Sequence, residues 1–176
     1  MAGYTLYDAS VGLMKPGVES LKAILKKAES TASAKGTDMD ALLTSRLHED
    51  MLPLSFQVHV VTDTVQKTMA RCNGKEPESW SYDDIKTLDQ CYARIEKALE
   101  LINGASKDAI DAGAETMVPC GMGPGKTIQI AAKNYVNGYA LPNFFFHLST
   151  AYAILRSKGI ELGKSDYLGP FIGPYM

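Results

Sequence analysis

Residues 141–157 decide the fold class, and they read Leu141-Pro-Asn-Phe-Phe-Phe-His-Leu-Ser-Thr-Ala-Tyr-Ala-Ile-Leu-Arg-Ser157. Pro142 falls in the first turn of the helix that this stretch predicts, and Gly159 follows as the expected stop. Apolar side chains cover nearly the whole circumference of that helix. We therefore expect it to be the central and most buried helix of a larger all-α core.

Two earlier stretches show the three- and four-residue apolar spacing of helices that pack on one side. The first covers about residues 4–33 and contains Pro16, which should end or kink the helix near its middle. The second has Asp50 as its expected cap and Pro53 in its first turn, and it ends at Asn73-Gly74. A short connecting helix is predicted between them, over residues 38–47.

The third long helix is predicted to begin at Ser81, with Asp84 three residues on in a capping-box position, and to stop at Gly104. Further along, residues 116–130 alternate polar and apolar side chains around a glycine-rich turn, which predicts a small β-hairpin. Residues 166–176 carry Gly and Pro and are expected to pack loosely.

The turn Gly121-Met-Gly-Pro-Gly-Lys126-Thr127 superficially resembles a phosphate-binding loop. That motif would place its first glycine at position 120, where this chain has Cys120, and a helix should follow the loop. Because a strand pattern follows instead, we interpret the segment as a hairpin turn with an exposed lysine. The fold class is therefore all-α: a four-helix bundle, with a small hairpin before the last helix, in one domain over residues 1–176.

Composition excludes several classes of protein. The 18 Lys and Arg and 20 Asp and Glu residues give a net charge of −2, which is unlike a general nucleic-acid binder. No apolar stretch reaches the length of a membrane span. The start lacks the features of a signal peptide, and the three cysteines form no CxxC, so we expect a cytoplasmic protein.

His147 is the first candidate for chemistry, because it lies in an otherwise apolar helix. Asn143, His147 and Thr150 share one face of that helix. One interpretation is a core histidine whose nitrogens are satisfied by neighbouring side chains. The other is a general acid–base or metal ligand that faces a pocket between helices.

His59 is the second candidate, at the edge of the buried stripe of the second helix. Gln57 and Asp63 flank the other side of that helix, and either set could face the interior of the bundle. His48 lies in a polar run and is expected to be exposed. The predicted catalytic residues are His147, His59 and Asn143, and the predicted substrate-binding residues are Gln57, Asp63, Thr150, Tyr152 and Trp80.

The last helix and its flanks also resemble a known family. The string Pro142-Asn-Phe-Phe-Phe-His147 is specific, and Asp166-Tyr-Leu-Gly169 and Tyr7-Asp-Ala-Ser10 add to it, as do Arg46-Leu, Asp50-Met, Pro53-Leu and Gln57-Val. These residues are similar to a bacterial and fungal family called domain of unknown function 1993. The resemblance runs over about residues 4–169.

That family is grouped with the DinB/YfiT-like four-helix bundles, so the resemblance implies the same fold. Relatives in the group include metal-dependent thiol transferases and a thiol-dependent isomerase, whose metal is held by one histidine on the second helix and a His-x-x-x-His pair on the last. By position, His59 or Gln57 stands for the first ligand and His147 for the last. Asn143 takes the remaining position and is a poor ligand for a transition metal.

Three functions follow as hypotheses. The favoured one is an enzyme that performs acid–base chemistry on a small organic molecule without a cofactor, of the isomerase, cyclase or lyase type. The group suggests a tailoring step in fungal secondary metabolism for such an enzyme. The second is a metalloenzyme that uses a divalent metal held by His59, His147 and a carboxylate such as Asp50 or Asp63. The third is a non-catalytic bundle that binds a ligand or forms a homodimer.

Overall fold

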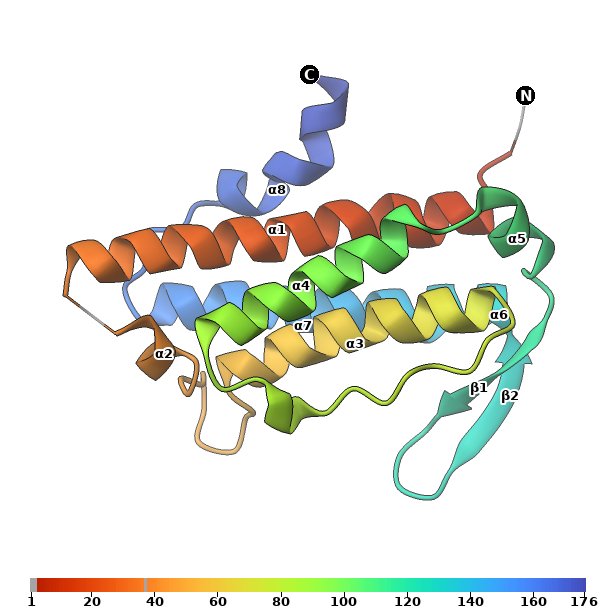
Figure 1. Ribbon diagram of the computed structural model, residues 1–176, viewed down its shortest axis with the longest axis horizontal. Coiled ribbons are helices and arrows are strands. Elements are labelled where there is room, and N and C mark those ends of the chain that lie inside the picture. The colour runs from red at the N-terminus through yellow and green to blue at the C-terminus, as the bar shows by residue number, and fades with distance from the viewer. Residues whose placement is uncertain (1–2, 37) are drawn as a thin grey trace.

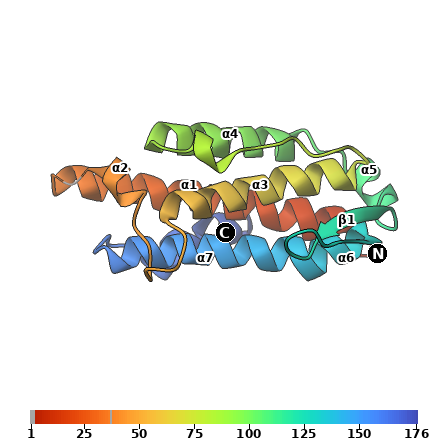
Figure 2. The same cartoon turned by 90° about the horizontal axis from the view of Figure 1, so that it is seen from below.

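Four long helices run side by side along the long axis of the computed structural model, which describes residues 3–36 and 38–176 (Figure 1). They are α1 (Leu6–Ala34), α3 (Leu54–Cys72), α4 (Leu88–Asn103) and α7 (Leu141–Ser157). Figure 2 shows α1 and α3 lying between α4 and α7, so that the two middle helices each contact both outer ones. The predicted four-helix bundle is confirmed.

Shorter elements connect and cover the bundle. They are α2 (Met39–Leu42), the 3₁₀ turn η1 (Tyr82–Asp84), α5 (Lys107–Ala112), β1 (Met117–Gly121), β2 (Thr127–Ala131), α6 (Ala132–Tyr135), the π turn η2 (Val136–Ala140), α8 (Lys164–Ile172) and the 3₁₀ turn η3 (Gly173–Tyr175). The hairpin and α5 lie at one end of the bundle and α2 lies at the other (Figure 1).

The two strands form the antiparallel hairpin that the sequence predicts, and the structure places Val118 opposite Ile130 and Cys120 opposite Ile128. Its turn contains Gly123 and Gly125 at positive φ values of 113° and 70°, a conformation that glycine adopts without strain. A strand, and not a helix, follows the glycines. The interpretation as a hairpin turn, and not as a phosphate-binding loop, is therefore confirmed.

The prediction allowed the first helix to end or to kink at Pro16, and the helix does not end there, because α1 continues from Leu6 to Ala34. A capping box between Thr5 and Asp8 fixes its start. Met14 and Val18, on either side of the proline, are both fully buried. Packing on both sides of Pro16 thus outweighs the backbone hydrogen bond that the proline removes.

Two predicted caps are wrong. Pro53 itself occupies the cap position of α3, whereas the carboxylate of Asp50 lies in an exposed loop 2.7 Å from Nδ1 of His48. Ser81 caps only the single turn η1, and α4 begins later, at a capping box formed by Thr87 and Gln90. In this box the Thr87 hydroxyl accepts from the backbone N–H of Gln90 at 3.3 Å, and Oε1 of Gln90 accepts from the backbone N–H of Thr87 at 3.0 Å.

The last helix is longer and less buried than predicted. Helical backbone continues through α6, η2 and α7, so the chain is helical from Ala132 to Ser157. The expectation that α7 is the most buried helix is wrong: it buries six of its 17 residues, whereas α3 buries 13 of its 19. Phe146 is 60% exposed, since α7 lies at the side of the bundle and not at its centre.

The C-terminal stretch is helical, which sequence patterning did not predict. Helix α8 packs across α1 (Figure 1), where Lys27 forms an ion pair of 2.7 Å with Asp166. The rings of Tyr167 and Phe171 stack and pack against the core. Among the residues that the structure describes, no helix combines the length and the apolar character that a membrane span requires.

The close approach of α1 to α7 depends on Gly17. A Cβ atom at this buried position would lie 2.4 Å from the ring of Phe144, far inside van der Waals contact. Phe144 is fully buried on the α7 side of the core. The absence of a side chain at Gly17 therefore sets the spacing of these two helices.

We predict that Gly17→Ala destabilises the protein by about 1–3 kcal/mol, because the ring of Phe144 must move out of a packed core. Gly12→Ala is the matched control on the same helix, since a Cβ there meets nothing within 4 Å. The control should be neutral or should raise the free energy of unfolding by about 0.5–1 kcal/mol. Urea unfolding measures both, and equal effects of the two substitutions would contradict this account of the helix spacing.

Candidate functional site

A hydrogen bond joins His147 on α7 to Gln57 on α3. Nδ1 of His147 lies 2.7 Å from Oε1 of Gln57. The glutamine side chain is 2% exposed, whereas the histidine ring is half-buried. The sequence left open whether Gln57 or His59 faces this part of the bundle. The structure places Gln57 in contact with His147, and the rings of His59 and His147 both pack near Phe56.

Aromatic rings surround the two histidines. The Phe56 ring lies 6.1 Å from His147, 6.0 Å from His59 and 5.2 Å from Tyr82, measured between centroids. His59 and Tyr82 are 6.0 Å apart. The exposed ring of Phe146 packs edge-on against His147 at 5.1 Å. We call these five residues the ring cluster, and it forms where α3, α7 and η1 meet.

Burial keeps the histidines of the ring cluster neutral. Loss of water and, to a smaller extent, repulsion from the His59 ring together lower the pKa of His147 to about 4. Burial also lowers the pKa of His59, partly offset by the carboxylate of Asp63. Within the described part of the chain, Nδ1 of His59 is buried and has no hydrogen-bond partner. Both rings are therefore uncharged at neutral pH.

Asn143 and Thr150, the other predicted residues on the His147 face, make contacts of their own. The amide of Asn143, four residues before His147 on α7, donates to the hydroxyl of Thr64, seven residues beyond Gln57 on α3, at 3.2 Å. The hydroxyl of Thr150 donates to the carbonyl of Phe146 at 2.7 Å. Asn143 thus lies at the same α3–α7 contact as His147, and Thr150 is bound within its own helix.

Three of the predicted substrate-binding residues make their hydrogen bonds and ring contacts outside the ring cluster, although the carboxylate of Asp63 is close enough to His59 to oppose the lowering of its pKa by burial. Asp63 bonds to Lys67 at 2.5 Å and to Gln66 at 3.0 Å. Trp80 lies under the guanidinium of Arg94 at 4.7 Å, away from α7. Tyr152 faces α8, and its hydroxyl donates to the carbonyl of Leu162 at 3.3 Å.

Sequence reasoning missed three members of the ring cluster: Phe56, Tyr82 and Phe146. Tyr82 lies in a loop that has no periodic pattern, so only the folded chain brings it to α3. There its hydroxyl lies 3.1 Å from that of Ser55. Phe56 carries a weak signal, because an aromatic residue three positions before His59 falls on the same helix face.

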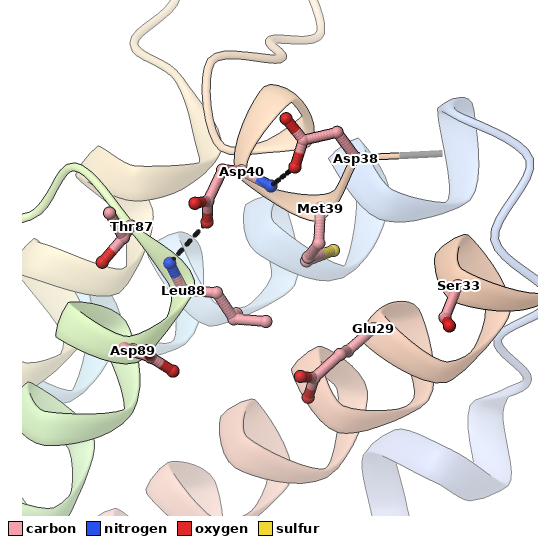
Figure 3. Close-up of a pocket in the computed structure, with 8 residues that line it drawn as sticks. All are labelled: Glu29, Ser33, Asp38, Met39, Asp40, Thr87, Leu88 and Asp89. Carbon is pink, nitrogen blue, oxygen red and sulfur yellow. Dashed lines mark hydrogen bonds between the residues drawn. The ribbon is translucent and has the colours of Figure 1, made fainter. Parts of the chain in front are cut away.

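A hollow of about 450 Å³ lies apart from the ring cluster (Figure 3). It opens where α1, α2 and the start of α4 meet, and four carboxylates gather there, with Asp40 bonded to the backbone of Leu88 at 2.7 Å. Its lining residues are Glu29, Ser33, Asp38, Met39, Asp40, Thr87, Leu88 and Asp89. None of the predicted site residues lines it.

Comparison with known proteins identifies the family. The family model described as a domain of unknown function, DUF1993, matches residues 6–168. The chain belongs to the DUF1993 family. A crystal structure of a DinB family member protein from Shewanella denitrificans is similar to this DUF1993 chain, with a TM-score of 0.83 and 35% sequence identity over 93% of this chain and 92% of that one. This DUF1993 protein therefore has a DinB-like bundle. No curated protein matches it.

The DinB-like fold implies a metal ion, but the donors of this DUF1993 chain do not fit one. The ring cluster offers two imidazoles, whereas a transition-metal site needs at least three strong donors. The described residues contain no group of three His, Cys, Asp or Glu side chains placed to hold a metal. Asp50 is in an exposed loop with His48, and the oxygens of Asp63 are bonded to Lys67 and Gln66. We therefore derive no step through a metal.

We predict a pH-dependent loss of stability that depends on His147. The unfolded chain binds a proton at this residue near its ordinary pKa of 6.5, whereas the folded chain binds it only near pH 4. Stability is therefore complete above pH 6.5 and falls as the pH drops toward 4. The full shift corresponds to about 3 kcal/mol, and solvent screening of the half-buried ring reduces the expected loss to about 1–2 kcal/mol.

Urea unfolding at pH 7 and at pH 4.5 measures this loss in wild type and in His147→Gln. The variant keeps an amide that can donate to Gln57 but cannot titrate, so its loss should be smaller by that amount. Parallel losses in both proteins would contradict the assignment to His147.

Proposed function

We propose that this DUF1993 protein is an enzyme that acts on a small organic molecule and uses His147 as a metal-independent proton acceptor. The contact that supports this is the hydrogen bond of 2.7 Å between Nδ1 of His147 and Gln57. It occupies one ring nitrogen and leaves Nε2 as the atom that can meet a substrate. Burial keeps that ring uncharged at neutral pH, which is the state that a base requires.

The chemistry that fits is proton transfer within one substrate. A substrate O–H or C–H gives its proton to Nε2, which forms an imidazolium, and the same proton returns to another atom of the substrate or to a leaving group. This sequence describes an isomerase, a cyclase or a lyase and needs no co-reactant. The His59 ring packs near the same Phe56 ring as His147, and it is suited to donate a hydrogen bond to the charge that develops on the substrate.

The low pKa of His147 restricts the substrates. A base with a pKa of about 4 removes protons efficiently only from acidic positions, such as a phenolic oxygen or a carbon between two carbonyl groups. The negative charge left on the substrate then pairs with the imidazolium and stabilises it. The rings of Phe56, Tyr82 and Phe146 provide apolar contacts for the carbon skeleton of such a molecule.

We expect some phenols or enolisable carbonyl compounds from a metabolite library to raise the melting temperature of the protein. A ligand at about 100 times its Kd stabilises by about 2.7 kcal/mol, or roughly 5–10 °C for a chain of this size. The protein is first dialysed against a chelator, and its metal content is measured. His147→Gln should abolish the shift, whereas His48→Gln, in an exposed loop, should leave it unchanged.

Turnover of the stabilising compounds is then followed by mass spectrometry and by exchange of substrate protons with deuterated water. Exchange that needs His147 would support the enzyme. Stabilisation without exchange or turnover would contradict catalysis and favour a ligand-binding protein. About one metal ion per chain, lost in both His147→Ala and His59→Ala, would contradict the metal-independent mechanism.

A further inference from the structure

We infer that Gln57 is a positioning residue that holds the ring proton of His147 on Nδ1 and so keeps Nε2 unprotonated toward the substrate. This inference rests on the proposed function, since it concerns the atom that accepts the substrate proton. It is carried by the hydrogen-bond partners of the Gln57 side chain, each of which has a fixed chemical role.

The amide group of Gln57 can adopt only one orientation. Its nitrogen lies 2.8 Å from the carbonyl oxygen of Leu52 and 3.3 Å from that of Pro53. A carbonyl oxygen only accepts hydrogen bonds, so both contacts require the NH₂ group on that side. The opposite orientation would bring the amide oxygen against two carbonyl oxygens. Oε1 must therefore be the atom that faces His147.

The two carbonyl groups are themselves held in place. The loop before α3 is tied to the preceding segment by the backbone N–H of Leu54, which donates to Ser45 at 2.9 Å, and by that of Ser55, which donates to Leu43 at 3.0 Å. Gln57 is 2% exposed, so water does not compete for its amide. The start of α3 thus fixes the orientation of a side chain that reaches α7.

The orientation of Gln57 determines the tautomer of His147. Oε1 only accepts, so Nδ1 of His147, at 2.7 Å, must carry the hydrogen and donate it. A neutral imidazole has one N–H, and Nε2 therefore keeps its lone pair. After a substrate gives its proton to Nε2, the Nδ1–H bond to Gln57 is unchanged. In the other tautomer Nε2 would carry a hydrogen and could not act as a base.

Nitrogen NMR of the full chain labelled with ¹⁵N-histidine tests this directly. The His147 signals are assigned with His147→Gln, and long-range proton–nitrogen spectra are recorded at pH 7. We expect Nδ1 at the shift of a protonated ring nitrogen and Nε2 at that of an unprotonated one. In Gln57→Met, which keeps the length of the side chain but removes the acceptor, the two nitrogens should move toward each other as the tautomers mix.

Gln66→Met is the matched control. Gln66 is also a 2% exposed glutamine of α3, and it bonds to Asp63 and to the backbone of Glu78, away from His147. Its loss should lower stability and leave the His147 nitrogen shifts unchanged. A wild-type spectrum with the hydrogen on Nε2, or nitrogen shifts that Gln57→Met does not alter, would overturn the inference.

The wild-type spectrum decides the tautomer even where Gln57→Met does not fold. The outcome is also separate from that of the proposed function. A single Nδ1–H tautomer in a protein whose compounds show no exchange at His147 would support the positioning role and contradict the catalysis. Exchange of substrate protons that needs His147, in a protein whose spectrum shows the hydrogen on Nε2, would support the catalysis and contradict the positioning role.

Discussion

The hydrogen bond from His147 to Gln57 connects α7 to α3, and the properties of the candidate site depend on it. Burial keeps the ring neutral, and the hydrogen bond satisfies one of its nitrogens and fixes its orientation. The bundle makes this contact available because α3 is the helix with the largest buried share of residues, and the loop before it supplies the carbonyls that fix Gln57. The orientation of His147 therefore depends on the backbone carbonyl groups of Leu52 and Pro53 as well as on the Gln57 side chain.

The bundle was predictable because its stripes of apolar residues and its glycine stops are local signals. The hairpin followed from the alternation around Gly123 and Gly125, and His147 stood out as a polar residue in an apolar helix. Helix starts were less predictable, since Ser81 and Thr87 are both good caps and each begins an element, η1 and α4 respectively. The helix does not end at Pro16, because burial of the side chains on both sides of it outweighs the loss of one backbone hydrogen bond.

The partners of the candidate residues could not be predicted, because they come from contacts between distant segments. Gln57 and His147 are 90 positions apart, and Tyr82 joins them from a loop without periodicity. Tyr152 and Trp80 were expected at the site, but the Tyr152 hydroxyl bonds to the carbonyl of Leu162, just before α8, and the Trp80 ring packs against Arg94. Membership of the DUF1993 family and the DinB-like fold account for the arrangement of the four helices. The side chains on α3 and α7 determine the chemistry proposed for the site.

The central claim is that the bundle holds His147 as a neutral imidazole. An NMR titration of the His147 ring protons between pH 8 and pH 3 measures its pKa in the folded protein most directly. The account predicts a midpoint near pH 4, because burial and the neighbouring His59 both oppose the charge. A midpoint near 6.5, the ordinary value for histidine, would show a solvated ring and would contradict the account.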